Sequence, residues 1–228
     1  MTILLGIFTV TLTILMYRLA LRIHRKWPHP FTLPVLLSMI FIIIVLLIFQ
    51  LSYEQYMIGG NWINQLLGPA VVALAYPLYI QRRTLLKLAA PLLIGTTVGA
   101  FTGVISGLLL TNWAGFSEEI LYAISAKSVT TPVAVVITET LGGITSLAAI
   151  MVVIAGISGV IVHQYIFKLF GIHSELGRGL GMGSAAHAIG TAEVMKESQL
   201  AGSISTVAMV NSALVVSIIT PWLVSLFL

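Results

Sequence analysis

The stretch S-A-K-S-V-T-T-P-V-A-V-V-I-T-E-T-L-G-G, residues 125–143, interrupts a chain that is otherwise almost continuously apolar. It carries one lysine, four threonines, two serines, a proline and a glutamate. An ionisable side chain at membrane depth costs about 2.5–3.5 kcal/mol, so it normally faces a protein interior or a wet cavity. Pro132 cannot donate a backbone hydrogen bond, and irregular backbone is tolerated at that depth only where protein or water satisfies it. The stretch therefore predicts a broken helix that forms a binding site.

The composition around this stretch is typical of an all-α polytopic membrane protein, for which the lipid bilayer is the expected surrounding. Hydrophobic residues make up 58% of the 228 residues and charged residues only 8%, whereas a soluble domain needs far more surface charge. The net charge of +4 comes from basic residues beside apolar segments, so no nucleic-acid partner is expected. The absence of cysteine excludes disulfides and thiolate metal sites.

Charged connections between the apolar segments predict the topology. Basic residues between positions 18 and 26 follow the first apolar segment. The positive-inside rule makes that connection cytoplasmic, which puts the N-terminus outside. We expect a single transmembrane domain, residues 1–228, with about six transmembrane helices at residues 2–21, 33–51, 66–79, 85–111, 145–169 and 203–228.

Two further segments are predicted to enter the membrane and return to the same side. Residues 119–143 begin and end at the predicted outer face. Residues 177–197 have an apolar centre too short to span and a basic residue at each end, which favours entry from the cytoplasm. The fold class is therefore expected to include two oppositely inserted re-entrant segments. Glycines at a spacing of four form a smooth stripe that permits close helix approach: Gly95, Gly99, Gly103 and Gly107.

A shift of 60 residues aligns the chain with itself. Lys127 then meets His187, and Thr131 meets Thr191. The two units, 85–143 and 145–202, each contain one span and one re-entrant segment, with opposite predicted orientations. Such inverted repeats place substrates near the bilayer midplane, at discontinuous helices.

The polar residues of these two segments are the candidate site, and each has an alternative structural interpretation. Lys127 either binds a substrate carboxylate or extends to the membrane interface. Thr130 and Thr131 either donate hydroxyls to a substrate or bond their own helix carbonyls. His187 is either a protonation switch or a buried structural histidine, and Thr191 shares its face if the segment is helical.

Acidic residues and metal ligands are sparse. Glu139 and Glu193 are candidates for proton coupling together with His187, with solvated surface positions as the alternative. No histidines and carboxylates have the spacing of a metal site, so no metal or cofactor is expected. No nucleophile–base pair is visible, so an enzyme is not expected.

Three motifs resemble those of the LrgB/CidB family, and the resemblance covers nearly the whole chain. They are L-G-P-A-V-V-A-L-A-Y-P-L-Y (67–79), A-K-S-V-T-T-P-V-A (126–134) and A-A-H-A-I-G-T-A (185–192). One departure is Ala126, where many members carry proline, which leaves the local break to Pro132. The expected substrate-binding residues lie in these three motifs and in the last span. They are Lys127, Ser128, Thr130, Thr131, Pro132, His187, Gly190, Thr191, Gly68, Pro69 and Asn211.

The resemblance implies two functions. Some members resemble transporters of small monocarboxylates, among them bacterial pyruvate uptake systems and the plastid glycolate/glycerate translocator. We therefore expect a proton-coupled secondary transporter in the bacterial inner (cytoplasmic) membrane. Other members are described as antiholin-like regulators of murein hydrolase activity and autolysis, acting with a small LrgA/CidA-type membrane partner. A homodimer is left open.

Overall fold

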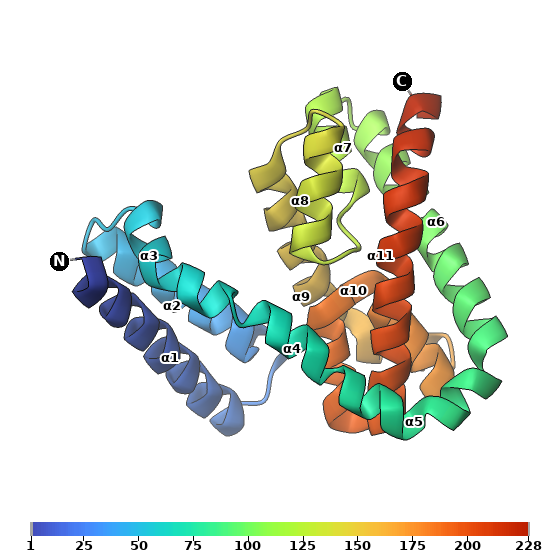
Figure 1. Ribbon diagram of the computed structural model, residues 1–228, viewed down its shortest axis with the longest axis horizontal. Coiled ribbons are helices and arrows are strands. Elements are labelled where there is room, and N and C mark those ends of the chain that lie inside the picture. Colours follow the sequence, from blue (N-terminus) through green and yellow to red (C-terminus); the bar gives the residue numbers. More distant parts are fainter. Residues whose placement is uncertain (1, 228) are drawn as a thin grey trace. The chain divides into compact units, whose positions relative to one another are not determined.

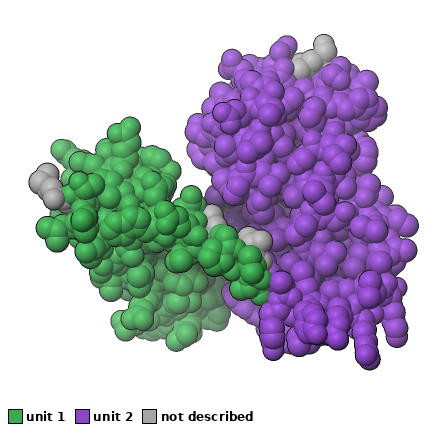
Figure 2. All heavy atoms as spheres, in the orientation of Figure 1, with its two compact units in different colours: residues 1–73 green, residues 74–228 purple. Residues whose placement is uncertain are grey.

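The computed structural model describes residues 2–227, and within this range it contains only helices and their connections. The all-α prediction is confirmed. The chain divides into two compact units, residues 1–73 and residues 74–228 (Figure 2). The expectation of one transmembrane domain stays a prediction. The helices of each unit make most of their contacts within that unit.

The first unit contains four α-helices and a short 3-10 helix. They are α1 (Thr2–Lys26), η1 (Pro30–Thr32), α2 (Pro34–Ile48), α3 (Tyr53–Asn64) and α4 (Leu67–Ala73). Helix α1 packs closely on α3. The approach is so close that a Cβ at Gly59 would overlap the backbone carbonyl of Gly6. The hydroxyls of Thr13 and Tyr56 join the same two helices at 2.9 Å. Glycine thus allows two helices to approach where side chains would separate them.

The second unit holds the rest of the chain (Figure 1). Its helices are α5 (Ala75–Lys87), α6 (Ala89–Trp113), α7 (Glu118–Ser125), α8 (Thr131–Thr140), α9 (Thr145–Leu169), α10 (Glu175–Glu197) and α11 (Gln199–Phe227). The core draws fully buried apolar residues from α6, α7, α9 and α11, such as Val104, Leu121, Val152 and Val216. This core supports the two interrupted segments, α7–α8 and α10.

Five helical segments within residues 2–227 are long and apolar enough to cross a membrane. They are Thr2–Lys26, Tyr53–Lys87, Ala89–Trp113, Thr145–Leu169 and Gln199–Leu226. The expectation of about six spans also counts residues 33–51. There the helix covers only Pro34–Ile48, 15 residues, or about 22 Å at 1.5 Å per residue, which is less than a bilayer core of about 30 Å. The third expected span, 66–79, lies in a longer helical segment that is interrupted at Leu74.

Both predicted re-entrant segments are helical hairpins whose ends meet. In the first, α7 and α8 have 8 and 10 residues, each too short to span. A Cβ at Gly143 would lie 3.1 Å from the carbonyl oxygen of Glu119, so the segment returns to its start. In the second, α10 is broken at His187, whose φ of 40° and ψ of −131° are not helical. Arg178 at its beginning contacts Glu197 at its end.

The two hairpins follow helices of equal length. Helix α6 has 25 residues and precedes α7–α8, and α9 has 25 residues and precedes α10. Because α7–α8 returns to its start, α6 and α9 run in opposite directions. Figure 1 shows α7 and α8 near one end of the second unit and α10 near the other. The repeat units 85–143 and 145–202 and their opposite orientation in a bilayer stay a prediction.

Candidate functional site: a cavity between two broken hairpins

Lys127 lies in the break between α7 and α8, against the glycine stripe of α6. Its ammonium group donates to the carbonyl oxygen of Gly103 at 2.8 Å. The same nitrogen would lie 2.8 Å from a Cβ at Gly107, so glycine leaves space for the ammonium group in its observed position. The side chain is partly buried, and within residues 2–227 it has no carboxylate partner. An ammonium has three donors, and Gly103 uses one of them.

The rest of the first break consists of short polar side chains at the start of α8. Ser128 is buried, and its hydroxyl faces α6 at Gly103. Thr130 has extended backbone and occupies the N-cap of α8 without a side-chain capping bond. Thr131 and Pro132 form the first turn, where the Thr131 side chain is partly buried and Pro132 is exposed. A helix N-terminus carries unbonded N–H groups and a partial positive charge, which favour an anion.

His187 forms the second break, and its ring is directed toward α9. The ring is 3% exposed, and Nε2 lies 2.9 Å from the carbonyl oxygen of Val152. A Cβ at Gly156 would lie 2.8 Å from the imidazole, so glycine again makes room for a basic side chain. Thr191 donates to the His187 carbonyl oxygen at 2.8 Å and lies 2.8 Å from the hydroxyl of Ser205 on α11. The segment is not helical at His187, and both side chains have partners within the protein.

A cavity of about 350 Å³ lies where the two hairpins meet α6. It is lined by Gly95, Gly99, Thr102 and Gly103 of α6, Ser128 of the first break, and Leu180, Gly181, Ser184 and Ala185 of α10. The glycine stripe is thus one wall of the cavity. Ser184 is 7% exposed and its hydroxyl has no hydrogen-bond partner. Sequence reasoning missed Ser184, although it precedes His187 by three residues within a glycine-rich segment.

Of the predicted substrate-binding residues only Ser128 lines this cavity, and Lys127 and His187 lie outside its lining with the rest. Asn211 on α11 donates a hydrogen bond to the hydroxyl of Thr96 on α6. This bond joins the two helices. Glu139 is exposed near the end of α8. Glu193 accepts a hydrogen bond from Lys196 at 2.7 Å near the end of α10.

The remaining three candidates are two glycines and a proline, which offer no polar side chain. Gly190 is buried in the second half of α10, where a Cβ would overlap Ala186. Gly68 and Pro69 lie in α4 of the first unit, where both are exposed. A Cβ at Gly68 would have no atom within 4 Å. The assignment of all of these residues to substrate binding or proton coupling stays a prediction.

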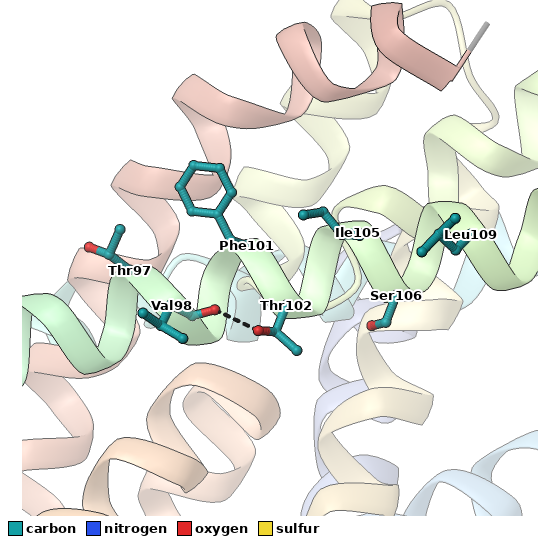
Figure 3. Close-up of a pocket in the computed structure, with 7 residues that line it drawn as sticks. All are labelled: Thr97, Val98, Phe101, Thr102, Ile105, Ser106 and Leu109. Atoms are coloured by element: carbon teal, nitrogen blue, oxygen red, sulfur yellow. Dashed lines mark hydrogen bonds between the residues drawn. The ribbon is translucent and has the colours of Figure 1, made fainter.

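A larger hollow, about 410 Å³, has little chemistry to offer (Figure 3). All seven lining residues belong to α6: Thr97, Val98, Phe101, Thr102, Ile105, Ser106 and Leu109. The hydroxyl of Thr102 donates to the Val98 carbonyl oxygen of the same helix at 2.8 Å. No charged group lines this hollow, and every residue comes from a single helix. The smaller cavity is the better candidate because elements from two hairpins converge on it.

The fold defines the class of this protein: an all-α polytopic membrane protein with two broken hairpins in the same unit. Within residues 2–227 no three histidine or acidic side chains gather as metal ligands. The sequence matches the LrgB-like family over residues 13–226. The chain therefore belongs to the LrgB family.

Similar proteins cover almost the full length. The chain is 45% identical to the uncharacterized protein YxaC of Bacillus subtilis (strain 168), over 97% of this chain and 96% of that protein. It is 31% identical to the uncharacterized protein YwbG of the same organism, over 96% of this chain and 98% of that protein. It is also 31% identical to the holin-like protein CidB of Staphylococcus aureus (strain Mu50 / ATCC 700699), over 97% of both chains. No solved structure matches.

Proposed function

We propose that this protein is a secondary transporter of small monocarboxylates such as pyruvate or glycolate. The observation that carries the proposal is the ammonium group of Lys127. It lies in a helix break, partly buried, with no carboxylate partner within residues 2–227. A buried charge without a counter-ion is costly, and at membrane depth such a residue typically marks a substrate or ion pathway. A carboxylate substrate supplies the missing negative charge.

The surroundings of Lys127 fit a small anion. The half-helix α8 begins four residues further on, and its N-terminal N–H groups favour negative charge. The neighbouring cavity of about 350 Å³ is at the lower end of the roughly 300–1,000 Å³ of ligand pockets. Its walls offer hydroxyls and glycine backbone, which suit the oxygens of a carboxylate. These features support a substrate of few atoms over a large lipid or peptide.

Proton coupling is the second part of the proposal, with His187 as the protonation switch. The imidazole side chain changes charge between pH 5 and 8 in many proteins. Here it lies at the break in α10 and is bonded to a carbonyl of α9. A change in its charge alters that bond and therefore the conformation of the hairpin. Glu139 and Glu193 are further candidates for proton coupling in this proposal.

The proposed setting is the bacterial cytoplasmic membrane with the N-terminus outside, because basic residues concentrate at the C-terminal end of α1. We propose no catalytic activity and no cofactor. The proposed partners are the carboxylate substrate and a small LrgA/CidA-type membrane protein, and a homodimer is the proposed self-assembly.

Uptake of labelled pyruvate and glycolate into proteoliposomes tests transport. Liposomes that contain the purified protein alone are compared with protein-free liposomes, with and without an inward proton gradient. Gradient-stimulated uptake supports a proton-coupled transporter. Uptake that appears only after the LrgA/CidA-type partner is added makes the protein half of a two-component carrier. Absence of uptake in both preparations contradicts the transport proposal.

The alternative function is regulation of murein hydrolase activity and autolysis with the same partner, without transport. The relative from Staphylococcus aureus is named a holin-like protein, and this name favours the alternative. The discriminating experiment is an autolysis assay in cells that carry Lys127→Ala. A regulator that works through packing keeps its effect on autolysis in this variant, because the protein surface is unchanged. A transporter whose effect depends on carboxylate flux loses it.

A further inference from the structure

Ser184 is the one cavity-lining residue whose hydroxyl is both buried and without a hydrogen-bond partner. Four side-chain hydroxyls in the described chain are buried in this way: Thr138, Ser184, Ser212 and Thr220. Only Ser184 lines the cavity at α6. A buried donor without a partner costs free energy, so such a group calls for a specific explanation.

The hydroxyls of Ser184 and Ser128 lie beside neighbouring glycines of the stripe on α6. A Cβ at Gly99 would lie 3.4 Å from the Ser184 hydroxyl oxygen, and a Cβ at Gly103 would lie 3.1 Å from the Ser128 hydroxyl oxygen. Gly99 and Gly103 are four residues apart, or about 6 Å along the helix axis. Two O–H···O hydrogen bonds of about 2.8 Å nearly span this distance. The two serines, one from each hairpin, can therefore donate to the same small anion.

Lys127 completes this arrangement at the next turn of α6. Its ammonium group is bonded to Gly103, the glycine that also faces Ser128. The order along the stripe is thus Ser184 at Gly99, Ser128 at Gly103, and Lys127 between Gly103 and Gly107. The hydroxyls supply hydrogen bonds, and the lysine supplies the charge that a carboxylate needs.

We propose that Ser184 is a substrate-contacting residue that donates a hydrogen bond to the carboxylate in the cavity between Ser128 and Gly99. This inference rests on the transport function proposed above and names its site more closely. It adds a residue from the second hairpin and makes both hairpins part of one binding site. It also assigns substrate size selection to Gly99, because a methyl group there reaches into the cavity 3.2 Å from the Ser184 Cβ.

The chain contains no cysteine, so Ser184→Cys introduces a single thiol that differs from serine by one atom. The matched control is Ser212→Cys on α11, because Ser212 is also buried and unpartnered but does not line the cavity. Both purified full-length variants are treated with a small methanethiosulfonate reagent, with and without pyruvate. We expect labelling at position 184 that pyruvate slows severalfold, and no protection by pyruvate at position 212.

A second measurement uses Ser184→Ala and Ser212→Ala in the uptake assay. Loss of one hydrogen bond to a charged ligand is expected to raise the KM for pyruvate about tenfold in Ser184→Ala. Ser212→Ala is expected to keep the wild-type KM. Gly99→Ala is expected to reduce uptake of pyruvate more than uptake of the smaller anion formate.

The outcomes separate this inference from the proposed function. If position 184 is not labelled, or is labelled at the same rate with pyruvate present, the binding site is wrong. An unchanged KM in Ser184→Ala, with wild-type uptake intact, overturns the contact while the transport function stands. Protection of position 184 in a protein that shows no uptake, with or without the LrgA/CidA-type partner, supports the binding site and overturns the transport function.

Discussion

The ammonium group of Lys127 donates to the carbonyl oxygen of Gly103, four residues before Gly107, which leaves space for it on α6. The second hairpin repeats this relationship. His187 is bonded to the carbonyl oxygen of Val152, four residues before Gly156, which leaves space for its ring on α9. Each hairpin break is thus joined to the preceding long helix by one basic side chain at a glycine. The shift of 60 residues aligns the two basic residues.

Replacement of Lys127 by methionine is expected to abolish carboxylate uptake while the protein stays folded. Methionine fills a similar volume, removes the charge and cannot bond to Gly103. Arginine should not restore uptake, because the larger guanidinium does not fit beside Gly107. The measurement is initial uptake of labelled pyruvate, with Lys196→Met at an exposed position as the control. Uptake at the wild-type rate in Lys127→Met contradicts the role of the charge.

Alanine at Gly156 is expected to destabilise the protein more than alanine at Gly107. At Gly156 the added methyl group meets the buried imidazole of His187, which has little room to move. Overpacking of this kind costs roughly 1–3 kcal/mol. At Gly107 it meets the flexible end of Lys127, which can shift. Thermal unfolding of the two variants in detergent, followed by tryptophan fluorescence, makes the comparison. An equal loss of Tm would mean that the ring is not confined.

Glycine at position 187 is expected to destabilise the protein less than alanine at the same position. Both substitutions remove the imidazole and its bond to Val152. Only glycine adopts the observed φ of 40° and ψ of −131° without strain, and strain of this kind costs roughly 1–3 kcal/mol. The Tm of the two variants tests this backbone effect. In the uptake assay both variants should lose stimulation by the proton gradient, and a gradient response that survives in both argues against His187 as the switch.

The ends of the α10 hairpin are expected to open when the contact between Arg178 and Glu197 is removed. These side chains join the two ends of the segment, and His163 on α9 lies 3.5 Å from the same carboxylate. Both members of the pair are about one-quarter to one-third exposed, so each single substitution to alanine should cost about 1 kcal/mol or less. Hydrogen–deuterium exchange over residues 175–197 should rise in Arg178→Ala.

A double substitution isolates the contribution of this pair. If the pair acts as a unit, Arg178→Ala together with Glu197→Ala should change the exchange rate less than the sum of the single changes. The effect should shrink at high salt, because partly exposed charges are screened. Strictly additive changes would show that the two side chains act separately.

Much of the fold could be predicted from local features of the sequence. Long apolar segments bounded by basic residues define the membrane helices, because backbone polar groups in lipid must be bonded within a helix. Pro132 and the polar residues around it mark the first break, and the short apolar centre of residues 177–197 marks the second. Hydropathy alone does not show where a helix ends, so residues 33–51 read as one span although α2 stops at Ile48.

The amino-acid sequence by itself determined the helical membrane class, the two hairpins and the basic residue in each break, because these depend on composition and on neighbours close in the chain. Only the tertiary structure decided which carbonyl oxygen each basic residue bonds to, and that Asn211 bonds to Thr96. It also decided that Ser184 lines the cavity with a hydroxyl that has no hydrogen-bond partner. Lys127 and Gly103 are 24 residues apart, and His187 and Val152 are 35 residues apart. Such contacts depend on how the hairpins pack against α6 and α9, and no local pattern encodes that packing.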